Sequence, residues 1–411
     1  MFLQILVNYG MIIVMKGGVT MKLTHKFKPS FSHKEEEIIK ELSFHTTKFY
    51  NIVNYAIREN NDIRPIYSSL DKQFKSNWHC NYLMAHNRQH CLKQLAKDWK
   101  SYFNSIKDYN NNPSKYKSQP QPPSFKNIKF ELPKVIQSLI YSKNASLSKG
   151  HTVKNTLQQV KIKQDYLTNE WYLLIIYNKD TTDKKQSDNI MSIDLGLDNL
   201  ASITFKNNLA SYIINGKTLK SKNRYYNKRI SKLQAIRMKQ TGSKHFKDTK
   251  QIKKLRVKRR NYITDYLHKA SKKVINLAKK HKASKIVIGD LKEIKQHNKN
   301  NKHFVAIPIQ KFKKLIEYKA KLEGIETIII NEAYTSGCSA IDKEQLTKDN
   351  YDKSRRITRG LFLANNSLKI NSDINGSLNI LRKYLKNSSP KLIDYARDIG
   401  VVASPERLRI A

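Results

Sequence analysis

Three acidic residues lie at positions where a carboxylate could bind a metal cation. Asp194 lies inside the apolar run IMSIDL, directly before Gly196. A carboxylate buried there is costly unless it is paired, hydrogen-bonded or bound to a metal. Glu332 ends the apolar run IETIIIN, and Asp373 falls in the first turn of a C-terminal helix. Taken singly, Glu332 also fits an ordinary surface acid, and Asp373 fits a helix-capping acid.

Taken together, the three acids fit a site for two magnesium ions. Magnesium prefers hard oxygen ligands, so Asp and Glu are suitable and no histidine is required. Two such ions about 3.5–4 Å apart activate a water and stabilise the leaving oxygen of an in-line displacement. The residue types therefore predict two-metal hydrolysis at Asp194, Glu332 and Asp373, with manganese as an alternative ion.

The segments around these acids alternate between apolar strands and helices, which indicates an α/β layer. Three segments are expected to form its strands: residues 190–205 around a glycine turn, Lys285–Leu291 and Ile325–Tyr334. The helices between them are the basic stretch Lys217–His281, broken once at Gly242, and an amphipathic helix closed by Gly324. A last helix begins near Asn371, and the tail after Lys386 is expected to be loosely held.

The N-terminal half has a different pattern. Lys22–Pro29 alternates like a strand, and Ser32 with Glu35 forms a capping box before a helix. A second helix is expected at residues 78–106, followed by a polar, proline-rich break at 109–124. Further strand-like runs follow at 160–163 and 171–177. This order of elements predicts a small β-barrel interrupted by helices.

The charge of the chain points to a polyanionic partner. Its 78 Lys and Arg residues against 33 Asp and Glu residues leave a net charge of +45. Nucleic acid is the expected partner, because cationic side chains displace the counterions condensed on phosphates. A membrane surface is disfavoured, since the charge is spread along most of the chain. Three cysteines give no disulfide framework, and residues 1–20 are interpreted as an N-terminal extension without a targeting signal.

Three motifs resemble those of the transposon-encoded TnpB (OrfB) family, RNA-guided nucleases related to the compact type V CRISPR effectors. They are IDLGLDNLASI, EAYTS and INSDINGSLNIL, and the PPSFK segment at Pro122–Lys126 fits the same order of elements. The likeness runs from about Met21 to about Leu385. It implies an RNase H-like core, called RuvC, in which Asp194 and Asp373 match the first and last catalytic acids.

The resemblance also implies a domain organisation: an α/β RuvC nuclease core plus an N-terminal β-barrel (the wedge) interrupted by a helical recognition insertion. The expected parts are an extension at 1–20, the wedge at 21–32 and 112–185, the recognition insertion at 33–111, the nuclease core at 186–333 and 366–385, a target-nucleic-acid-binding loop at 334–365, and a C-terminal tail at 386–411.

The chain departs from the family pattern at the middle acid. The family's usual acid closes the strand matching KIVIGDL, where this chain has Gly289. Asp290 is a poor replacement, because neighbouring residues on a strand point to opposite faces. Some members carry the acid on the E-x-Y-T-S segment, as Glu332 does here. In an RNase H-like sheet, as the resemblance implies, the Glu332 strand lies beside the KIVIGDL strand, which in turn flanks the Asp194 strand. The Glu332 side chain must then reach across about 10 Å, and Gly289 clears the path.

A second departure concerns zinc. Family members often carry two C-x-x-C pairs in the loop that here spans 334–361, whereas this chain has only Cys338 there. A structural zinc site needs four ligands as a rule. We therefore expect no zinc, and Cys338 is predicted to be a small buried residue.

Basic and aromatic residues are expected to contact nucleic acid. Lys250–Arg260 contains seven basic residues and no acid, which favours phosphate contact over a solvated helical hairpin. In RNA-guided systems base pairing reads the sequence while the protein reads backbone shape. The N-terminal helices and barrel would then read a flanking DNA motif. The expected contacts are Arg355, Arg356, Arg359, Tyr334, Lys253, Lys254, Arg256, Lys258, Arg259 and Arg260. The arginines of the loop could instead pair with acids such as Asp352, and Tyr334 could instead be core.

The leading interpretation is thus an RNA-guided, magnesium-dependent DNA endonuclease of a transposable element, acting in a prokaryotic cytoplasm near the nucleoid. Its expected partners are a guide RNA and double-stranded target DNA, with no membrane and no obligate protein partner. The alternative is a guided DNA-binding protein with an inactive nuclease, which Gly289 favours. A transposase in the strict sense is a third reading, but no tyrosine-nucleophile motif supports it.

Overall fold

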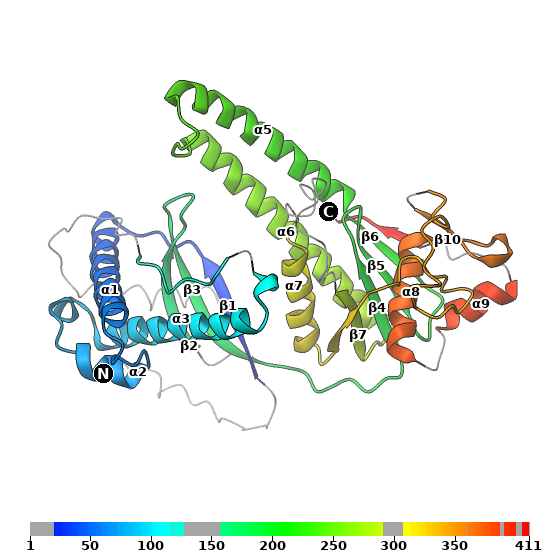
Figure 1. Ribbon diagram of the computed structural model, residues 1–411, viewed down its shortest axis with the longest axis horizontal. Helices are drawn as coiled ribbons and strands as arrows, with labels where there is room; N and C mark the ends of the chain where they lie inside the picture. Colours follow the sequence, from blue (N-terminus) through cyan, green and yellow to red (C-terminus); the bar gives the residue numbers. More distant parts are fainter. Residues whose placement is uncertain are drawn as a thin grey trace. The chain divides into compact units, whose positions relative to one another are not determined.

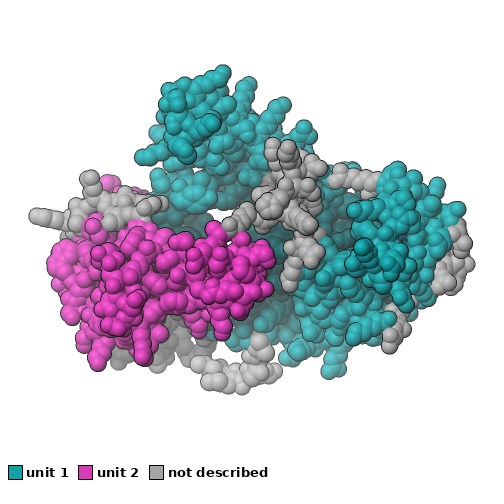
Figure 2. All heavy atoms as spheres, in the orientation of Figure 1, with its two compact units in different colours: residues 1–28, 155–411 teal, residues 29–154 magenta. Residues whose placement is uncertain are grey.

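The computed structural model describes residues 20–116, 118–126, 157–290, 307–358, 360–386, 390–399 and 405–410. The chain divides into two compact units, residues 1–28 with 155–411 and residues 29–154 (Figure 2). Each unit has a hydrophobic core of its own. Among the residues so described, no helix combines the length and apolarity needed to cross a bilayer.

The first unit is built on a six-stranded mixed sheet in the order β11-β6-β5-β4-β7-β8. Its strands are β4 (Ile190–Leu195), β5 (Asn199–Phe205), β6 (Tyr212–Asn215), β7 (Lys285–Asp290), β8 (Glu326–Asn331) and β11 (Glu406–Leu408). β4, β7 and β8 run parallel, whereas β5 is antiparallel to both β4 and β6. The predicted α/β layer is confirmed, including the position of β7 between β4 and β8.

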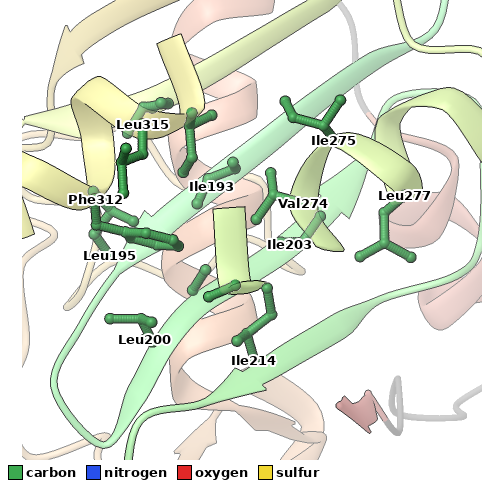
Figure 3. Close-up of a cluster of buried hydrophobic side chains, with 14 of the residues drawn as sticks. Ile193, Leu195, Leu200, Ile203, Ile214, Val274, Ile275, Leu277, Phe312 and Leu315 are labelled. Carbon is green, nitrogen blue, oxygen red and sulfur yellow. The ribbon is translucent and has the colours of Figure 1, made fainter. Parts of the chain in front are cut away.

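Helices cover both faces of this sheet (Figure 1). α6 (Lys250–Lys280) and α7 (Ile309–Leu322) pack on one face, and α8 (Ser372–Leu385) packs on the other. Alternate side chains of β4 point to opposite faces of the sheet, as strand geometry requires. Ile193 and Leu195 enter the α6/α7 core together with Val274 and Phe312 (Figure 3). Ser192 points the other way and donates to the backbone oxygen of Ser377 on α8 at 2.7 Å.

The C-terminal tail is part of the fold, so the prediction that it is loosely held is wrong. β11 pairs in parallel with β6 and forms the edge of the sheet, which satisfies backbone groups of β6. α9 (Lys391–Ile399) places Leu392 and Ile393 in a core shared with Ile374 and Leu378 of α8. The α9 segment KLIDYARDI is amphipathic and so carries a local helix signal, whereas β11 is ordered by its pairing with β6.

α5 (Lys217–Thr241) and α6 form a long antiparallel hairpin that projects beyond the sheet (Figure 1). The predicted break at Gly242 is confirmed, since this residue has φ +61° and ends α5 in the left-handed conformation. The side chain of Thr249 then caps α6 by accepting from the Ile252 amide. α5 carries nine basic residues and no acid.

A second, smaller sheet belongs to the same unit. β1 (Thr20–Phe27), β2 (Leu157–Gln164) and β3 (Trp171–Asp180) are antiparallel, in the order β1-β3-β2. The three predicted strands are therefore confirmed, and in the described part of the chain they form an open sheet. The predicted barrel needs further strands, and residues 127–156 of the expected wedge lie outside the described residues. The barrel stays a prediction, and residues 1–19 of the expected extension lie outside as well.

The second unit is helical. α1 (His33–Glu59) begins with the predicted capping box, in which Ser32 and Glu35 exchange side-chain and backbone hydrogen bonds. The predicted helix at 78–106 is instead a 3-10 turn (Trp78–Tyr82) followed by α3 (Ala85–Asn111), and α2 (Tyr67–Phe74) precedes it. Its core contains Phe49, Val53, Leu70, Leu92, Leu95 and Trp99.

Candidate functional site

Asp194 lies on β4 on the same side as Ser192, facing α8. Its carboxylate is so close to the helix that a Cβ built on Gly376 would come within 2.6 Å of Asp194 Oδ2. The neighbouring Ser377 bonds to the backbone and side chains of the sheet, including Thr204 Oγ1 at 3.0 Å. Small residues at these two positions of α8 therefore let the helix backbone approach the strand that carries Asp194.

Asp373 comes to the same place from the first turn of α8. The side chain of Asn371 caps this helix by accepting from the amides of Asp373 and Ile374, so the capping role does not fall to Asp373. Instead, Asp373 Oδ2 accepts from Asn199 Nδ2 at 2.6 Å, which ties it to the start of β5. Asp373 Oδ1 accepts from Arg356 at 3.1 Å. The acid is thus held toward the sheet and toward Asp194.

Glu332 follows β8 directly, two strands away from Asp194. In the parallel register Gly289 of β7 pairs with Ile330, and Ile288 pairs with Ile193 just before Asp194. A Cβ on Gly289 would lie 2.6 Å from Glu332 Oε2 and 2.7 Å from Ile380 Cδ1 of α8. The side chain of Glu332 therefore crosses over β7 through the space that the missing side chain leaves. This geometry is the one expected for an acid that reaches toward Asp194.

Asp290 turns away from this group. It forms an ion pair with Lys313 of α7 at 3.0 Å, and both side chains are buried. α7 covers the opposite face of the sheet from α8. Asp290 therefore points to the opposite face of the sheet from Asp194, as expected, and its unsuitability as the middle acid stays a prediction.

The electrostatics of the site follow from burial and crowded negative charge. Asp194 keeps some solvent exposure, yet desolvation is the main cause that raises its pKa well above the usual range, followed by the charges of Glu332 and Asp373. Burial, and then the charge of Asp290, raise the pKa of Glu332 to about 7. Both shifts disfavour the ionised carboxylate, and positive charge added nearby would oppose them.

The three carboxylates fit a divalent cation by these observations. The buried Oε2 of Glu332 has no hydrogen-bond partner among the described residues. Glycine at 289 and 376 leaves room for two of the carboxylates against the backbone. In the part of the chain that the structure describes, however, no three His, Cys, Asp or Glu side chains already have metal-ligand geometry. The acids are close enough to repel one another, and a cation would have to draw them together.

Polar residues of α8 fix the loop that follows Glu332. Asn379 donates to the backbone oxygens of Thr335 and Cys338, and Asn375 bonds to both Cys338 and Ala340. Arg382 donates to the backbone of Glu344. Because Asp373 lies on the same helix, α8 sets the position of one acid directly and that of Glu332 through this loop.

The arginines of the loop have separate roles. Arg355 is bound by Asp342 at 2.9 Å and Glu344 at 2.5 Å and also donates to Leu363 O. These contacts place Arg355 in the internal network of the loop, where its acidic partners are Asp342 and Glu344 and not Asp352. Its predicted contact with phosphate stays a prediction. Arg356 instead contacts Asp373. Arg359 lies outside the described residues.

Tyr334 is not a core residue, since 38% of it is exposed. It has φ +67°, an uncommon conformation for an aromatic residue, and it lies two residues after Glu332. Its ring meets that of Tyr351 edge-on at 6.0 Å between centroids. An exposed aromatic at this position is compatible with the predicted contact to a base or ribose, which stays a prediction.

The basic residues of α6 fall into two groups. Lys254 and Lys258 are exposed, and Lys253 is half-buried. Three arginines have protein partners: Arg256 pairs with Asp248, Arg259 donates to Asn223, and Arg260 pairs with the buried Asp165 at 2.7 Å. The lysines are therefore the better candidates for phosphate contact, and Arg260 links the hairpin to the small sheet.

Cys338 is buried with no exposed surface, as predicted for a small core residue. It packs against residues of the same loop, and its thiol donates to Thr347 O at 3.8 Å. The expected absence of zinc stays a prediction.

Several site residues were not identified from the sequence. The asparagines at 371, 375 and 379 recur every four residues in INSDINGSLNIL, a spacing that puts them on one helix face next to apolar residues and indicates polar contacts there. Asn199 and the pairing of Arg356 with Asp373 had no comparable signal, because both depend on contacts between distant segments.

Two family models match the chain. The OrfB_IS605 model, described as a probable transposase, matches residues 172–295, and the Cas12f1-like TNB domain matches residues 310–380. The first match contains Asp194, and the second contains Glu332 and Asp373. Both matches fall in the first unit.

Two curated proteins and one solved structure are similar to the chain. The TnpB-like protein MJ0751 of Methanocaldococcus jannaschii is 28% identical over 242 residues, which cover 57% of this chain and 78% of that protein. The CRISPR-associated endodeoxyribonuclease Cas12f2 of a Micrarchaeota archaeon is 25% identical over 235 residues, covering 53% of this chain but 41% of Cas12f2. A cryo-EM structure of the Cas12f1–sgRNA–target DNA complex matches with a TM-score of 0.53 at 15% identity, covering 85% of this chain and 83% of that chain.

The structural match shows a shared fold, and the sequence matches include the segments that carry all three acids. The chain is similar to the TnpB (OrfB) family and to its relatives among the compact type V effectors.

Proposed function

We propose that the chain is an RNA-guided, magnesium-dependent DNA endonuclease encoded by a transposable element. The observation that carries this proposal is the path of Glu332 across Gly289 toward the face where Asp194 meets α8 and Asp373. Without that path the chain would have two acids and a glycine in place of the third. The family supports the choice of partners, because one relative is named an endodeoxyribonuclease and a structural neighbour is a complex with sgRNA and target DNA.

Asp194, Glu332 and Asp373 would hold the ions. Magnesium, when bound, supplies an activated water and stabilises the leaving oxygen of a phosphodiester. The protein's part is to present three ionised carboxylates from rigid elements. Asn199 fixes the orientation of Asp373, and Gly289 and Gly376 keep the backbone close to the carboxylates. Glu332, with a pKa of about 7, is partly protonated near neutral pH and releases that proton when positive charge arrives.

The rest of the chain would bind the nucleic acids. The α5–α6 hairpin, with its large excess of Lys and Arg over Asp and Glu, would follow the backbone of the guide RNA or of the guide–target duplex. The loop at 334–365 would contact the target strand beside the acids. The helical insertion at 33–111 and the wedge at 21–32 and 112–185 would read a short flanking DNA motif.

The direct test is cleavage of a guide-matched plasmid by the purified protein–RNA complex. We expect cutting only with magnesium or manganese present, and loss of cutting in Asp194→Ala. Asp188→Asn is the matched control, because Asp188 is an exposed acid paired with Lys206 away from the site. Cutting by Asp194→Ala at the wild-type rate would contradict the proposed mechanism.

The second candidate is an RNA-guided DNA-binding protein with an inactive nuclease. It is favoured by one observation, the glycine at 289 where the family has its usual middle acid. The same plasmid assay separates the two functions. A wild-type complex that binds matched DNA in a gel-shift assay, but leaves it intact at every magnesium and manganese concentration, would support the inactive form.

A further inference from the structure

Arg356 occupies a position that its sequence motif does not explain. Of the neighbouring arginines in SRRITRG, Arg355 is held within the loop by two acids, whereas Arg356 leaves the loop and reaches α8. Its guanidinium donates to Ser372 Oγ and to Asp373 Oδ1, both at 3.1 Å. It is therefore bound to one of the three acids that would hold the metal.

The positive charge of Arg356 acts on the whole acidic cluster. Arg356 donates to one carboxylate oxygen of Asp373, and Asn199 donates to the other, so both oxygens accept hydrogen bonds from the protein. The charge of Arg356 also opposes the rise in the pKa of Asp194. Among the described residues Arg356 is the cation in direct contact with Asp373, whereas Lys313 pairs with Asp290 and acts on Glu332 through its charge alone.

We propose that Arg356 takes the place of the metal cation at Asp373 in the free protein. When nucleic acid binds, Arg356 leaves Asp373 and binds a phosphate of the nucleic acid instead. This inference rests on the proposed function of the three acids. Carboxylates that repel one another need a positive charge to stay together, and a guanidinium at Asp373 supplies one. It also competes with a divalent ion for that oxygen, so the free protein binds metal weakly.

The exchange is physically reasonable because Arg356 is accessible. Its side chain is 39% exposed, against 16% for Arg355. A guanidinium binds phosphate in the same forked geometry that it uses for carboxylates. A DNA or RNA strand laid along the loop at 334–365 would offer phosphates to Arg356, free Asp373 for the metal, and place the phosphate beside the acids.

The first experiment measures Mn²⁺ binding to the guide-free protein by the loss of the free Mn²⁺ EPR signal. Arg356→Ala should bind Mn²⁺ about threefold or more tightly than wild type, because a competing exposed ion pair of ordinary strength is removed. Arg356→Lys keeps the charge and should bind nearly as weakly as wild type. Lys353→Ala is the matched control in the absence of DNA, since Lys353 lies in the same loop near the Tyr351 ring and pairs with no acid in the described part of the chain.

A second measurement adds a single-stranded DNA oligonucleotide with non-hydrolysable linkages. With this DNA bound, the Mn²⁺ affinity of the wild-type protein should rise by the same factor of about three or more. The Mn²⁺ affinity of Arg356→Ala should change little when DNA is added. Equal or weaker Mn²⁺ binding by Arg356→Ala without DNA, or an equal DNA-induced gain in both proteins, would overturn the proposal.

The proposed function fails in a different way. If Asp194→Ala and Asp373→Asn leave Mn²⁺ binding unchanged in both the wild-type and Arg356→Ala backgrounds, then the acids are not the metal ligands. If the acids bind Mn²⁺ as proposed but the guide complex does not cut DNA, then the role of Arg356 stands and the nuclease assignment is wrong.

Discussion

Glu332 has an environment unlike that of an ordinary glutamate. Its Oε2 is buried without a hydrogen-bond partner among the described residues, and burial with the nearby charge of Asp290 raises its pKa from 4.5 to about 7. A carboxyl group with a raised pKa takes up a proton on folding. Its destabilising effect is therefore absent below about pH 4.5 and grows as the pH rises to about 7.

Replacement of this acid should therefore stabilise the metal-free protein in a pH-dependent way. We expect Glu332→Gln to raise the free energy of unfolding by on the order of 1 to 3 kcal/mol at about pH 8, and by little near pH 4.5. Urea unfolding at the two pH values measures this difference. Glu326→Gln, at the exposed start of β8, is the control. If Glu332→Gln raises the free energy of unfolding by the same amount at both pH values, then Glu332 is not forced to ionise in a buried site.

At the scale of elements, the site depends on how closely α8 and β7 approach the carboxylates. Gly289→Ala would put a methyl group 2.6 Å from Glu332 Oε2 and 2.7 Å from Ile380 Cδ1. We expect the carboxylate to be displaced, with cutting reduced about tenfold or more and stability lowered by about 1 to 3 kcal/mol. Cleavage assays and thermal unfolding measure the two effects.

Gly360→Ala is the matched control for this substitution, because nothing lies within 4 Å of its added Cβ. It should change neither cutting nor stability appreciably. Normal cutting by Gly289→Ala would mean that the Glu332 side chain does not use the path across β7.

The basic helix α6 should separate into residues that stabilise the fold and residues that bind phosphate. Arg260→Ala leaves the buried Asp165 with Lys26 at 3.9 Å as its remaining cation, and should lower stability by about 1 to 3 kcal/mol. Lys254→Ala with Lys258→Ala should leave stability within about 0.5 kcal/mol of wild type. In the double variant, the slope of log K for RNA binding against log salt concentration should decrease by the amount expected for the loss of about two phosphate contacts. An unchanged salt dependence would show that these lysines do not contact the RNA backbone.

The sequence was most informative where the signal is local. The capping box at Ser32, the glycine turn after β4, the stop at Gly242 and the start of α8 at Asn371 all depend on neighbouring residues, and each was predicted close to its observed position. Apolar strands with an acid at the end were enough to propose Asp194 and Glu332. The family resemblance supplied the order of the strands.

Long-range contacts were the part that could not be predicted. Arg355 and Arg356 are adjacent and chemically identical, yet one holds the loop together and the other contacts Asp373. Nothing in the local pattern separates them, because the difference depends on where α8 lies. The tail was misjudged for the same reason, since β11 gains its order from pairing with β6.

At the scale of the whole molecule, a net charge of +45 must be balanced for the chain to stay compact. Self-repulsion of this size weakens the folded state when no polyanion is present. We expect the melting temperature of the free protein to rise as sodium chloride is increased from low to moderate concentration, while its affinity for RNA falls. A melting temperature that falls over this range would show that the charge is already balanced within the fold.

The central claim is that Asp194, Glu332 and Asp373 form one metal centre. The most direct measurement is anomalous diffraction at the manganese edge from crystals of the protein bound to guide and uncleaved DNA. We predict manganese peaks within ligand distance of all three carboxylates, with Glu332 reaching across Gly289. Manganese bound by the two aspartates alone, with Glu332 turned away from it, would contradict the account.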